Sequence, residues 1–541
     1  MLDQQEIARV LTYFELNSSY DVVHKIDAGN GLAADLHEFL ITPEGTALLT
    51  IYQKYPHDGL SAFRSFNVTE DPADADQGWI WDSVFQELAI DTREVVFEWR
   101  ASEHVEMEDT YHNVWHTGNH EDPFDWYHIN SIQKDDLGNY LISARYTHSV
   151  TYIDGRTGKI LWTMGGKSNM FMDLSDGLAL NFAWQHDARF VPLDSLPETY
   201  TPPKEQHGIT TQLLTMFDNA AEDQNYEYGM DMSRGLLLEI RYPNPMSGGA
   251  DRAGRKDRAR RSDLDAEDDP LADQHKLLEI NGTDPAYTVR VIKSYESPTS
   301  IRSSSQGSMQ LLPQKPHTDP KVFVGYGLNA AWTEFASNGS VLCDVHFGAN
   351  TSWERGDIQS YRSYKFPWSA WPRHSPEIAI SDDDMVIYVS WNGATEVVEW
   401  ALQASNWGDE DDEDSWTEVA RKTKIGFETA FHLPDTKVGV KRYLRAVAIS
   451  SRGKVLAHGA SKVLDRGYMA SFFPGMAKSL SEEAETANPI QVFWLAVALM
   501  AMGILGYEGY RRYLSWKLGG QAAGAVRWRK GGGYRLLIGD P

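Results

Sequence analysis

The sequence contains a single cysteine, Cys343, among 541 residues. One cysteine cannot form an internal disulfide, and it excludes a zinc or iron–sulfur site built from cysteines. Basic residues are few relative to acidic ones: 50 Lys and Arg stand against 77 Asp and Glu, so the net charge is −27. Because such a field repels phosphate backbones, nucleic acid is not expected as a partner.

Several catalytic motifs are absent as well. The sequence has no G-x-S-x-G turn, no G-x-x-x-x-G-K-[ST] phosphate loop and no H-E-x-x-H zinc motif. The first sixteen residues show no basic stretch followed by an apolar one, so no signal peptide is visible. Serine hydrolysis of the α/β type, phosphate-loop chemistry and zinc proteolysis therefore have no support.

Short β-rich runs separated by turn residues dominate residues 11–350, and helical periodicity is scarce. Single strands are expected at 47–52, 139–146, 212–219 and 321–327. Hairpins, often ending in an aromatic residue, are expected at 89–99, 152–162, 233–242 and 335–345. A four-stranded unit that recurs in this way predicts a β-propeller over residues 1–372, with a series of β-sandwiches as the alternative. The opening residues match only the end of a unit, so we expect an incomplete first blade.

The pattern changes in two places. Residues 244–275 have no apolar period and carry a basic block followed by an acidic one, which predicts a disordered insertion. Residues 373–466 alternate over five to seven strands, the size of an immunoglobulin- or fibronectin-like sandwich.

The C-terminal region contains one long apolar run, which predicts a transmembrane helix at 488–508 after an acidic linker at 467–487. A buried core helix is the alternative. Residues 509–541 hold seven Lys or Arg and one Asp, so this tail is expected in the cytosol and the preceding domains outside it or in the lumen. N-x-[ST] sites upstream agree with a glycoprotein; they begin at Asn17, Asn67, Asn281, Asn338 and Asn350.

Three histidines come shortly before strand units: His37, His128 and His186. A lone histidine on a strand is usually structural, but three in equivalent repeat positions would face the same axis of a propeller. Asn130 and Arg145 lie close to the second histidine in the sequence. We therefore expect these five side chains to converge at the inner strands.

Such a cluster has two possible chemistries. Three imidazoles can bind zinc or copper, or one imidazole can act as a nucleophile while its neighbours stabilise charge. Arginine beside histidine and asparagine suits a sulfate or phosphate group, because guanidinium presents a fixed fork of N–H donors to the oxygens. Arg189, and Gln306 at the matching place of the fourth unit, are expected to add to this binding.

Several long segments resemble the arylsulfotransferase family in its fungal, membrane-anchored branch, and the similarity covers roughly residues 10 to 370. They include ADLHEFLITPEGTALLTIY, DWYHINSIQKDDLGNYLISARY, FAWQHDARF, SQGSMQLLP and AAWTEFASNGSVLCDVHFGA. The resemblance implies a six-bladed propeller that moves a sulfuryl group from an aryl sulfate donor to a phenolic acceptor. It implies no nucleotide donor, no cofactor and no metal.

By motif order, the resemblance implies His186 as the nucleophile that becomes sulfated, with His128 as the alternative. His128 and Asn130 match an H-x-N pair, Arg145 matches an arginine, and His37 matches the earliest histidine. A protonated His128 would assist the leaving phenolate.

Aromatic residues beside these positions are expected to stack on the aryl groups, although packing between blades explains them equally well: Trp126, Tyr127 and Trp184. Two other readings stay open at this point. One is that the chain is a non-catalytic cell-surface propeller that binds a ligand or partner. The other is that it is a metal-dependent hydrolase.

Overall fold

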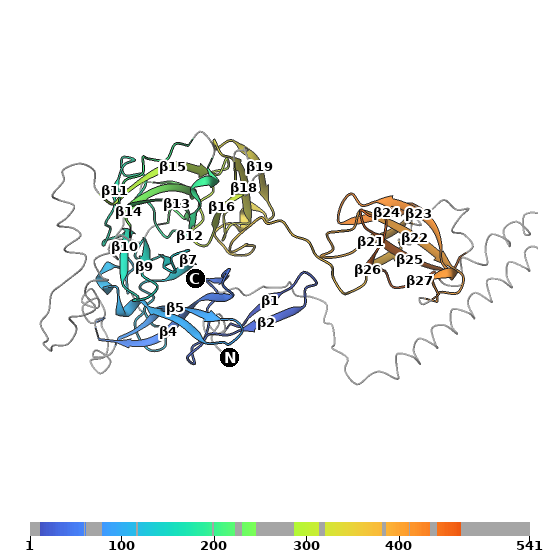
Figure 1. Ribbon diagram of the computed structural model, residues 1–541, viewed down its shortest axis with the longest axis horizontal. Helices are drawn as coiled ribbons and strands as arrows, with labels where there is room; N and C mark the ends of the chain where they lie inside the picture. The colour runs from blue at the N-terminus through green and yellow to red at the C-terminus, as the bar shows by residue number, and fades with distance from the viewer. Residues whose placement is uncertain are drawn as a thin grey trace, which may run out of the picture. The chain divides into compact units, whose positions relative to one another are not determined.

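The computed structural model describes residues 11–58, 60, 78–114, 117–196, 200–221, 230–244, 286–312, 320–380, 386–409, 412–432 and 441–466 (Figure 1). The predicted insertion from residue 245 onward, the acidic linker, the transmembrane helix and the basic tail lie outside these residues, as do Asn67 and Asn281. No helix within the described ranges is both long and apolar enough to span a bilayer.

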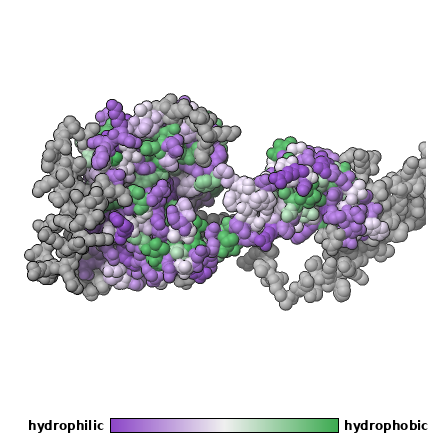
Figure 2. Space-filling view, viewed as in Figure 1, coloured by the Kyte–Doolittle hydropathy of each residue, from purple (hydrophilic) through white to green (hydrophobic). Residues whose placement is uncertain are grey.

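The chain divides into two compact units. Within the described ranges, the first unit consists of residues 11–15 and His24–Phe366, and the second of Leu16–Val23 and residues 367–466. Both are built from strands joined by turns and short 3-10 helices, which confirms the all-β prediction for the described residues. Hydrophilic residues cover much of the visible surface of each unit (Figure 2).

The described part of the first unit contains four sheets of four or five strands. The hairpin of β1 (Tyr13–Leu16) and β2 (Val22–Ile26) is divided between the units, because Leu16–Val23 is assigned to the second. The first sheet contains β3 (Phe39–Ile41), β4 (Thr46–His57), β5 (Gly78–Ala89) and β6 (Val95–Arg100). The second contains β7 (Ile129–Lys134), β8 (Tyr140–Ala144), β9 (Ser149–Ile153) and β10 (Ile160–Gly165). The third contains β11 (Met172–Asp173), β12 (His186–Val191), β13 (Ile209–Asp218), β14 (Arg234–Pro243) and β15 (Thr288–Glu296). The fourth contains β16 (Ser308–Leu312), β17 (Lys321–Gly325), β18 (Ala331–Ala336) and β19 (Val341–His346).

Within each of these sheets the consecutive strands from β3 to β6, β7 to β10, β12 to β15 and β16 to β19 pair antiparallel, as expected for strands joined by short turns. The hairpins predicted at 89–99, 152–162 and 335–345 are present. The one predicted at 233–242 is wrong, because this segment is the single long strand β14, paired residue by residue with β13 from Arg234 to Pro243. The two faces of β14 are both buried, so its sequence lacks the polar break that a turn needs.

Apolar side chains fill the space between consecutive sheets. Phe85 and Trp99 of the first sheet share a core with Ile132 and Ile142 of the second. Similar cores join the second sheet to the third and the third to the fourth. In Figure 1 the first strands β7, β12 and β16 lie toward the middle of the unit. The residues that lead into these strands are therefore brought near one another.

The second unit contains two sheets around one core. One sheet contains β20 (Glu377–Ile380), β21 (Val386–Ser390) and β24 (Glu428–His432). The other contains β22 (Glu399–Ser405), β23 (Thr417–Thr423), β25 (Tyr443–Ile449), β26 (Val455–Ala460) and the short β27 (Leu464–Asp465). Trp391, Trp400 and Phe431 are buried between them.

The remaining regular elements are single 3-10 turns: η1 (Ala101–Glu103), η2 (Met107–Asp109), η3 (Leu193–Ser195), η5 (Asn350–Ser352) and η6 (Glu413–Ser415).

Candidate active site

The predicted histidines lie at corresponding places in three sheets. His37 comes two residues before β3, His128 directly before β7, and His186 is the first residue of β12. In the fourth sheet Gln306 occupies the matching place before β16. His128 and Gln306 have φ of 62° and 66°, so the backbone turns sharply into its strand at these residues. This conformation is uncommon for side chains other than glycine, and it is often found at functional sites.

His37 and His128 form an edge-to-face pair, with ring centroids 4.5 Å apart. In each ring Nδ1 is hydrogen-bonded to a carboxylate oxygen. Nδ1 of His37 is 2.6 Å from Oδ1 of Asp35, and Nδ1 of His128 is 2.6 Å from Oδ2 of Asp125. Because a carboxylate only accepts hydrogen bonds, Nδ1 carries the hydrogen in both rings. In a neutral ring of this kind the Nε2 atom has a free lone pair.

Burial lowers the pKa of His128 to about 4, although Asp125 opposes this shift. His128 is therefore neutral near pH 7. The general-acid role, which depends on a protonated His128, is therefore not favoured near pH 7, because desolvation of the ring outweighs the neighbouring carboxylate. Burial raises the pKa of Asp35, but the interactions with His37 and His128 outweigh it and lower the pKa overall.

His186 is 3% exposed, and it is fixed from both sides of its ring. Nδ1 donates to the Gly307 carbonyl at 2.8 Å, so Nε2 holds the lone pair in the neutral ring. Burial and the positive charge of Arg362 hold the pKa of His186 well below 6.5. A neutral imidazole with Nε2 unprotonated is the nucleophilic form of histidine.

Tyr361, which the sequence analysis missed, lies between the histidines. Its hydroxyl is 3.3 Å from Nε2 of His186, and its ring centroid is 5.3 Å from that of His186 and 6.2 Å from that of His37. Its φ of 28° is strained for a tyrosine. Since Tyr361 lies beyond the last strand of the first unit, no strand pattern pointed to it.

Arg145 lies against the same group of rings. Its guanidinium carbon is 3.9 Å from the ring centroid of Trp184, a cation–π contact. Its backbone N–H donates to the His128 carbonyl at 2.9 Å. Within the described residues its Nε atom is buried without a hydrogen-bond partner. A guanidinium with an unused donor is a suitable group for an anionic oxygen.

The side-chain amide of Asn130 is partly occupied by a hydrogen bond within the protein. Its Nδ2 donates to the Gln185 carbonyl at 2.8 Å, while its Oδ1 is buried and lacks a partner among the described residues. One N–H of Asn130 is therefore used to join the second and third sheets.

Arg189 belongs to a buried ion-pair network. It pairs with Glu38 and with Asp187, whose carboxylate is 2.8 Å away, and it donates to the Ile132 carbonyl. Arg362 donates to the other oxygen of Glu38 at 3.0 Å. Because these bonds occupy the guanidinium of Arg189, this residue supports the structure of the site and has little capacity left to bind a ligand.

Gln306 is also engaged within the protein, since its Nε2 donates to Gln359 at 2.6 Å.

The three predicted aromatic residues fall into two groups, one at the site and one in the core. Trp184 contacts Arg145, but Trp126 and Tyr127 are each 1% exposed and belong to the core between the first two sheets. Of the predicted stacking residues, Trp184 alone contacts the charged group of the site.

The structure therefore brings together His37, His128, His186 and Arg145 near Tyr361. Within the described part of the chain, no group of three or more His, Cys, Asp or Glu side chains is placed to hold a metal ion. What the arrangement offers is a neutral nucleophilic imidazole, a second neutral imidazole and a guanidinium, which suits transfer of an oxygen-rich group.

Comparison with solved structures gives two similar folds of low identity. One is a protein of unknown function from Bacteroides caccae, 11% identical, with a TM-score of 0.23, covering 63% of this chain and 92% of that one. The other is a europium-containing methanol dehydrogenase, 9% identical, with a TM-score of 0.20, covering 70% of this chain and 68% of that one. Both scores are too low to support an argument. No curated protein matches the chain.

Residues 13–253 match the model of the arylsulfotransferase (ASST) family. This range contains His37, His128, Arg145 and His186. This match supports a sulfotransferase-type function in general, with small aromatic molecules as substrates. Residues 13–253, somewhat less than half of the chain, are therefore similar to the arylsulfotransferase family.

Proposed function

We propose that the first unit transfers a sulfuryl group from an aryl sulfate to a phenol, without a nucleotide donor, through a sulfated His186. One observation carries this proposal. The Gly307 carbonyl holds the Nδ1 hydrogen of His186, and burial keeps the ring neutral, so the Nε2 lone pair is available beside Arg145 and two further imidazoles.

In the first half of the reaction, Nε2 of His186 attacks the sulfur of the donor. The N–S bond forms as the S–O bond to the aryl group breaks, and the aryl group leaves as a phenolate. Arg145 donates to the sulfuryl oxygens through its unused Nε–H. His37 lies beside His128, and the Asp35 carboxylate next to Nδ1 fixes the orientation of its ring.

In the second half, the acceptor phenol replaces the departed phenolate. His128 is neutral, so its Nε2 takes the phenol proton as general base. The phenol oxygen attacks sulfur, the new O–S bond forms as the N–S bond breaks, and neutral His186 is restored. In the first half the hydroxyl of Tyr361 must release Nε2 before sulfur can approach, and it can return to Nε2 once the N–S bond has broken.

The test is incubation of the full chain with 4-nitrophenyl sulfate, with and without phenol, while nitrophenol release is followed by absorbance. We expect phenol-dependent release by the parent protein. Donor alone should add the mass of one sulfuryl group, located on His186 by peptide mass spectrometry.

His186→Gln should abolish both signals. The matched control is Thr215→Val, which changes a buried hydroxyl without a partner among the described residues. Absence of phenol-dependent release by the folded parent protein would reject the transferase proposal and favour a non-catalytic propeller that binds a ligand. Release that survives in His186→Gln would instead move the nucleophile to His128.

We further propose that the four sheets of the first unit are blades of a six-bladed β-propeller, and that the second unit is an immunoglobulin- or fibronectin-like sandwich. Antiparallel sheets in chain order, each sharing a core with the next, support the propeller. Two sheets around one core support the sandwich.

Anchoring by a helix at 488–508, with the two units outside the cytosol, also stays a proposal. It rests on the apolar run and the basic tail of the sequence. Protease protection of the tail in sealed vesicles that carry the full chain tests it.

A further inference from the structure

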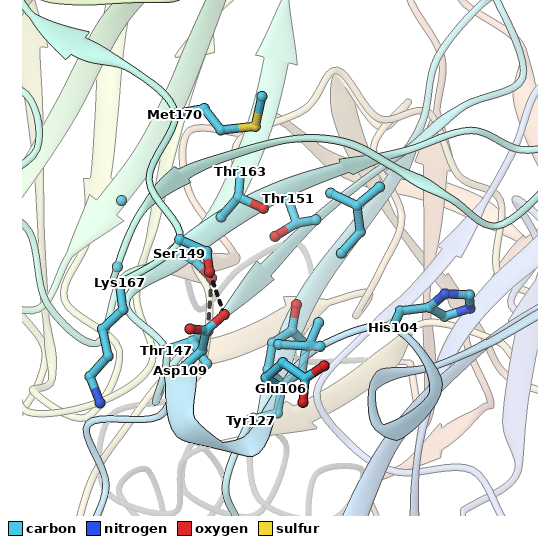
Figure 3. A pocket seen from close by; sticks show the side chains of 15 residues that line it. His104, Glu106, Asp109, Tyr127, Thr147, Ser149, Thr151, Thr163, Lys167 and Met170 are labelled. Atoms are coloured by element: carbon cyan, nitrogen blue, oxygen red, sulfur yellow. Dashed lines mark hydrogen bonds between the residues drawn. The ribbon is translucent and has the colours of Figure 1, made fainter. Parts of the chain in front are cut away.

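A separate cavity of about 250 Å³ lies beside the second sheet of the first unit. One wall is the face of β9 and β10, and the other comes from the segment that contains η1 and η2 (Figure 3). His37, His128, Arg145 and His186 do not line it. It is therefore distinct from the histidine cluster and has no role in the transfer reaction proposed above.

Hydroxyl groups make up most of the wall on the second sheet. Ser149 and Thr151 point to one face of β9 because they are two residues apart, and Thr163 is the partner of Thr151 on β10. Thr147 lies next to this row, and its hydroxyl is 2.7 Å from that of Ser149, a bond that one of the dashed lines in Figure 3 marks. A hydroxyl both donates and accepts hydrogen bonds, so this wall suits groups of either kind.

Tyr127 faces the cavity from the core between the first two sheets. It is 1% exposed, and its hydroxyl interacts with the side chain of Thr151 in the same lining. Burial raises the pKa of Tyr127, so this hydroxyl keeps its hydrogen and can donate it. Tyr127 therefore adds a fourth hydroxyl to the side of the cavity formed by Ser149, Thr151 and Thr163.

The charged residues of the cavity select against anions. Glu106 and Asp109 contribute two carboxylates. The lysine of the lining, Lys167, already donates to the Glu108 and Thr110 carbonyls at 2.8 and 2.6 Å. An anion would therefore meet two carboxylates and an engaged ammonium, whereas a neutral hydroxyl can donate to either carboxylate.

We propose that this cavity binds a neutral, polyhydroxylated molecule of about the size of one sugar ring. The size limit follows from the volume, which is below the roughly 300–1,000 Å³ of sites that take drug-sized ligands. The ligand's hydroxyls bond Ser149, Thr151 and Thr163 on one side and a carboxylate on the other.

The test is calorimetric titration of the full chain with D-glucose and with glycerol, each up to its solubility limit, in the absence of any sulfate ester. We expect saturable binding of at least one of them. D-glucuronate, which adds one carboxylate to the same ring, should bind at least about tenfold more weakly than D-glucose.

Thr151→Val and Tyr127→Phe each remove one hydroxyl and should weaken binding about fivefold to tenfold. Thr151→Ser keeps the hydroxyl and should bind like the parent. Thr215→Val, which removes a buried hydroxyl elsewhere in the first unit, is the matched control and should leave binding unchanged. Thermal melting of each variant shows that it is folded.

Two outcomes would overturn the proposal. One is the absence of saturable binding of both D-glucose and glycerol by the folded parent. The other is equal affinity in Thr151→Val and Thr215→Val. Neither outcome touches the sulfuryl transfer assay, which uses other residues and other ligands.

Discussion

The interiors of the two units are built on different principles. In the first unit an ion-pair network lies beside the histidines, with the buried carboxylates of Glu38 and Asp187 facing Arg189 and Arg362, whose side chains are 17% and 10% exposed. In the second unit the centre is a cluster of apolar side chains around Trp400. Burying charge costs free energy unless every charge is paired, so the second pattern is the simpler way to stabilise a fold. The network also acts on the histidine cluster, because the charge of Arg362 lowers the pKa of His186.

The largest expected effect comes from breaking the ion-pair network itself. Glu38→Gln leaves two largely buried guanidinium groups with Asp187 as their remaining carboxylate, and we expect a loss of about 3 kcal/mol in the free energy of unfolding of the first unit. Urea denaturation followed by tryptophan fluorescence measures it.

The control for this loss is Glu418→Gln, which removes an exposed ion pair with Arg421 in the second unit and should change nothing measurable. If both variants changed the free energy of unfolding by the same amount, the ion pairs of Glu38 would stabilise the first unit no more than an exposed ion pair does.

The next effect is a pH dependence confined to the first unit. Because the folded pKa of His128 is about 4 and its ordinary value is 6.5, the unfolded chain binds more protons between these values. Stability therefore decreases as pH falls from 6.5 to 4, by roughly 3 kcal/mol for this group alone. The lowered pKa of His186 adds in the same direction.

Denaturation curves at several pH values between 7 and 4 should show this decrease, and His128→Gln should reduce it. A first unit whose stability stays constant over that range would contradict the burial of neutral histidines.

A smaller effect is expected from Tyr361→Phe, which keeps the ring and removes the hydroxyl at Nε2 of His186. That hydroxyl stabilises the neutral imidazole, so its loss should raise the pKa of His186 and move the acidic limb of the activity profile to higher pH. We expect transfer to change by about tenfold or less and stability to change little. An activity profile that keeps its acidic limb in place would show that the contact has no influence on His186.

The smallest effect is expected in the apolar interior of the second unit. Thr429 is 4% exposed, and its hydroxyl has no hydrogen-bond partner within the described residues. Thr429→Val replaces this hydroxyl with a methyl group of similar size, so the free energy of unfolding should stay within about 1 kcal/mol of the parent or rise. A larger loss, measured by the same denaturation assay, would mean that the hydroxyl is paired in solution.

Much of the fold was predictable because strands and turns leave local patterns. Alternating apolar residues placed most strands of the first unit, but they failed at β14, where both faces are buried and the pattern of one long strand resembles two short ones. The equivalent positions of His37, His128 and His186 before their strands were also visible, since each repeat has the same order of elements.

The partners of the site were harder to predict. Asp35 and Asp125 stand two and three residues before their histidines, a local signal that the sequence analysis did not use. Tyr361 and Arg362 gave no signal, because they come from an irregular segment and contact the site only through the tertiary fold. The direction of Tyr127 was equally hidden, since a buried aromatic residue fits a core and a ligand site alike.

The position of Tyr361 and Arg362 has a practical consequence for where the first unit ends. A chain truncated after His346 would keep every strand of the four sheets and every histidine of the cluster. It would nevertheless expose the Nε2 face of His186 and leave half of the Glu38 carboxylate without its cation. The first unit should therefore be taken to end after Arg362, because a boundary drawn at the final strand omits the two residues that contact His186 and Glu38.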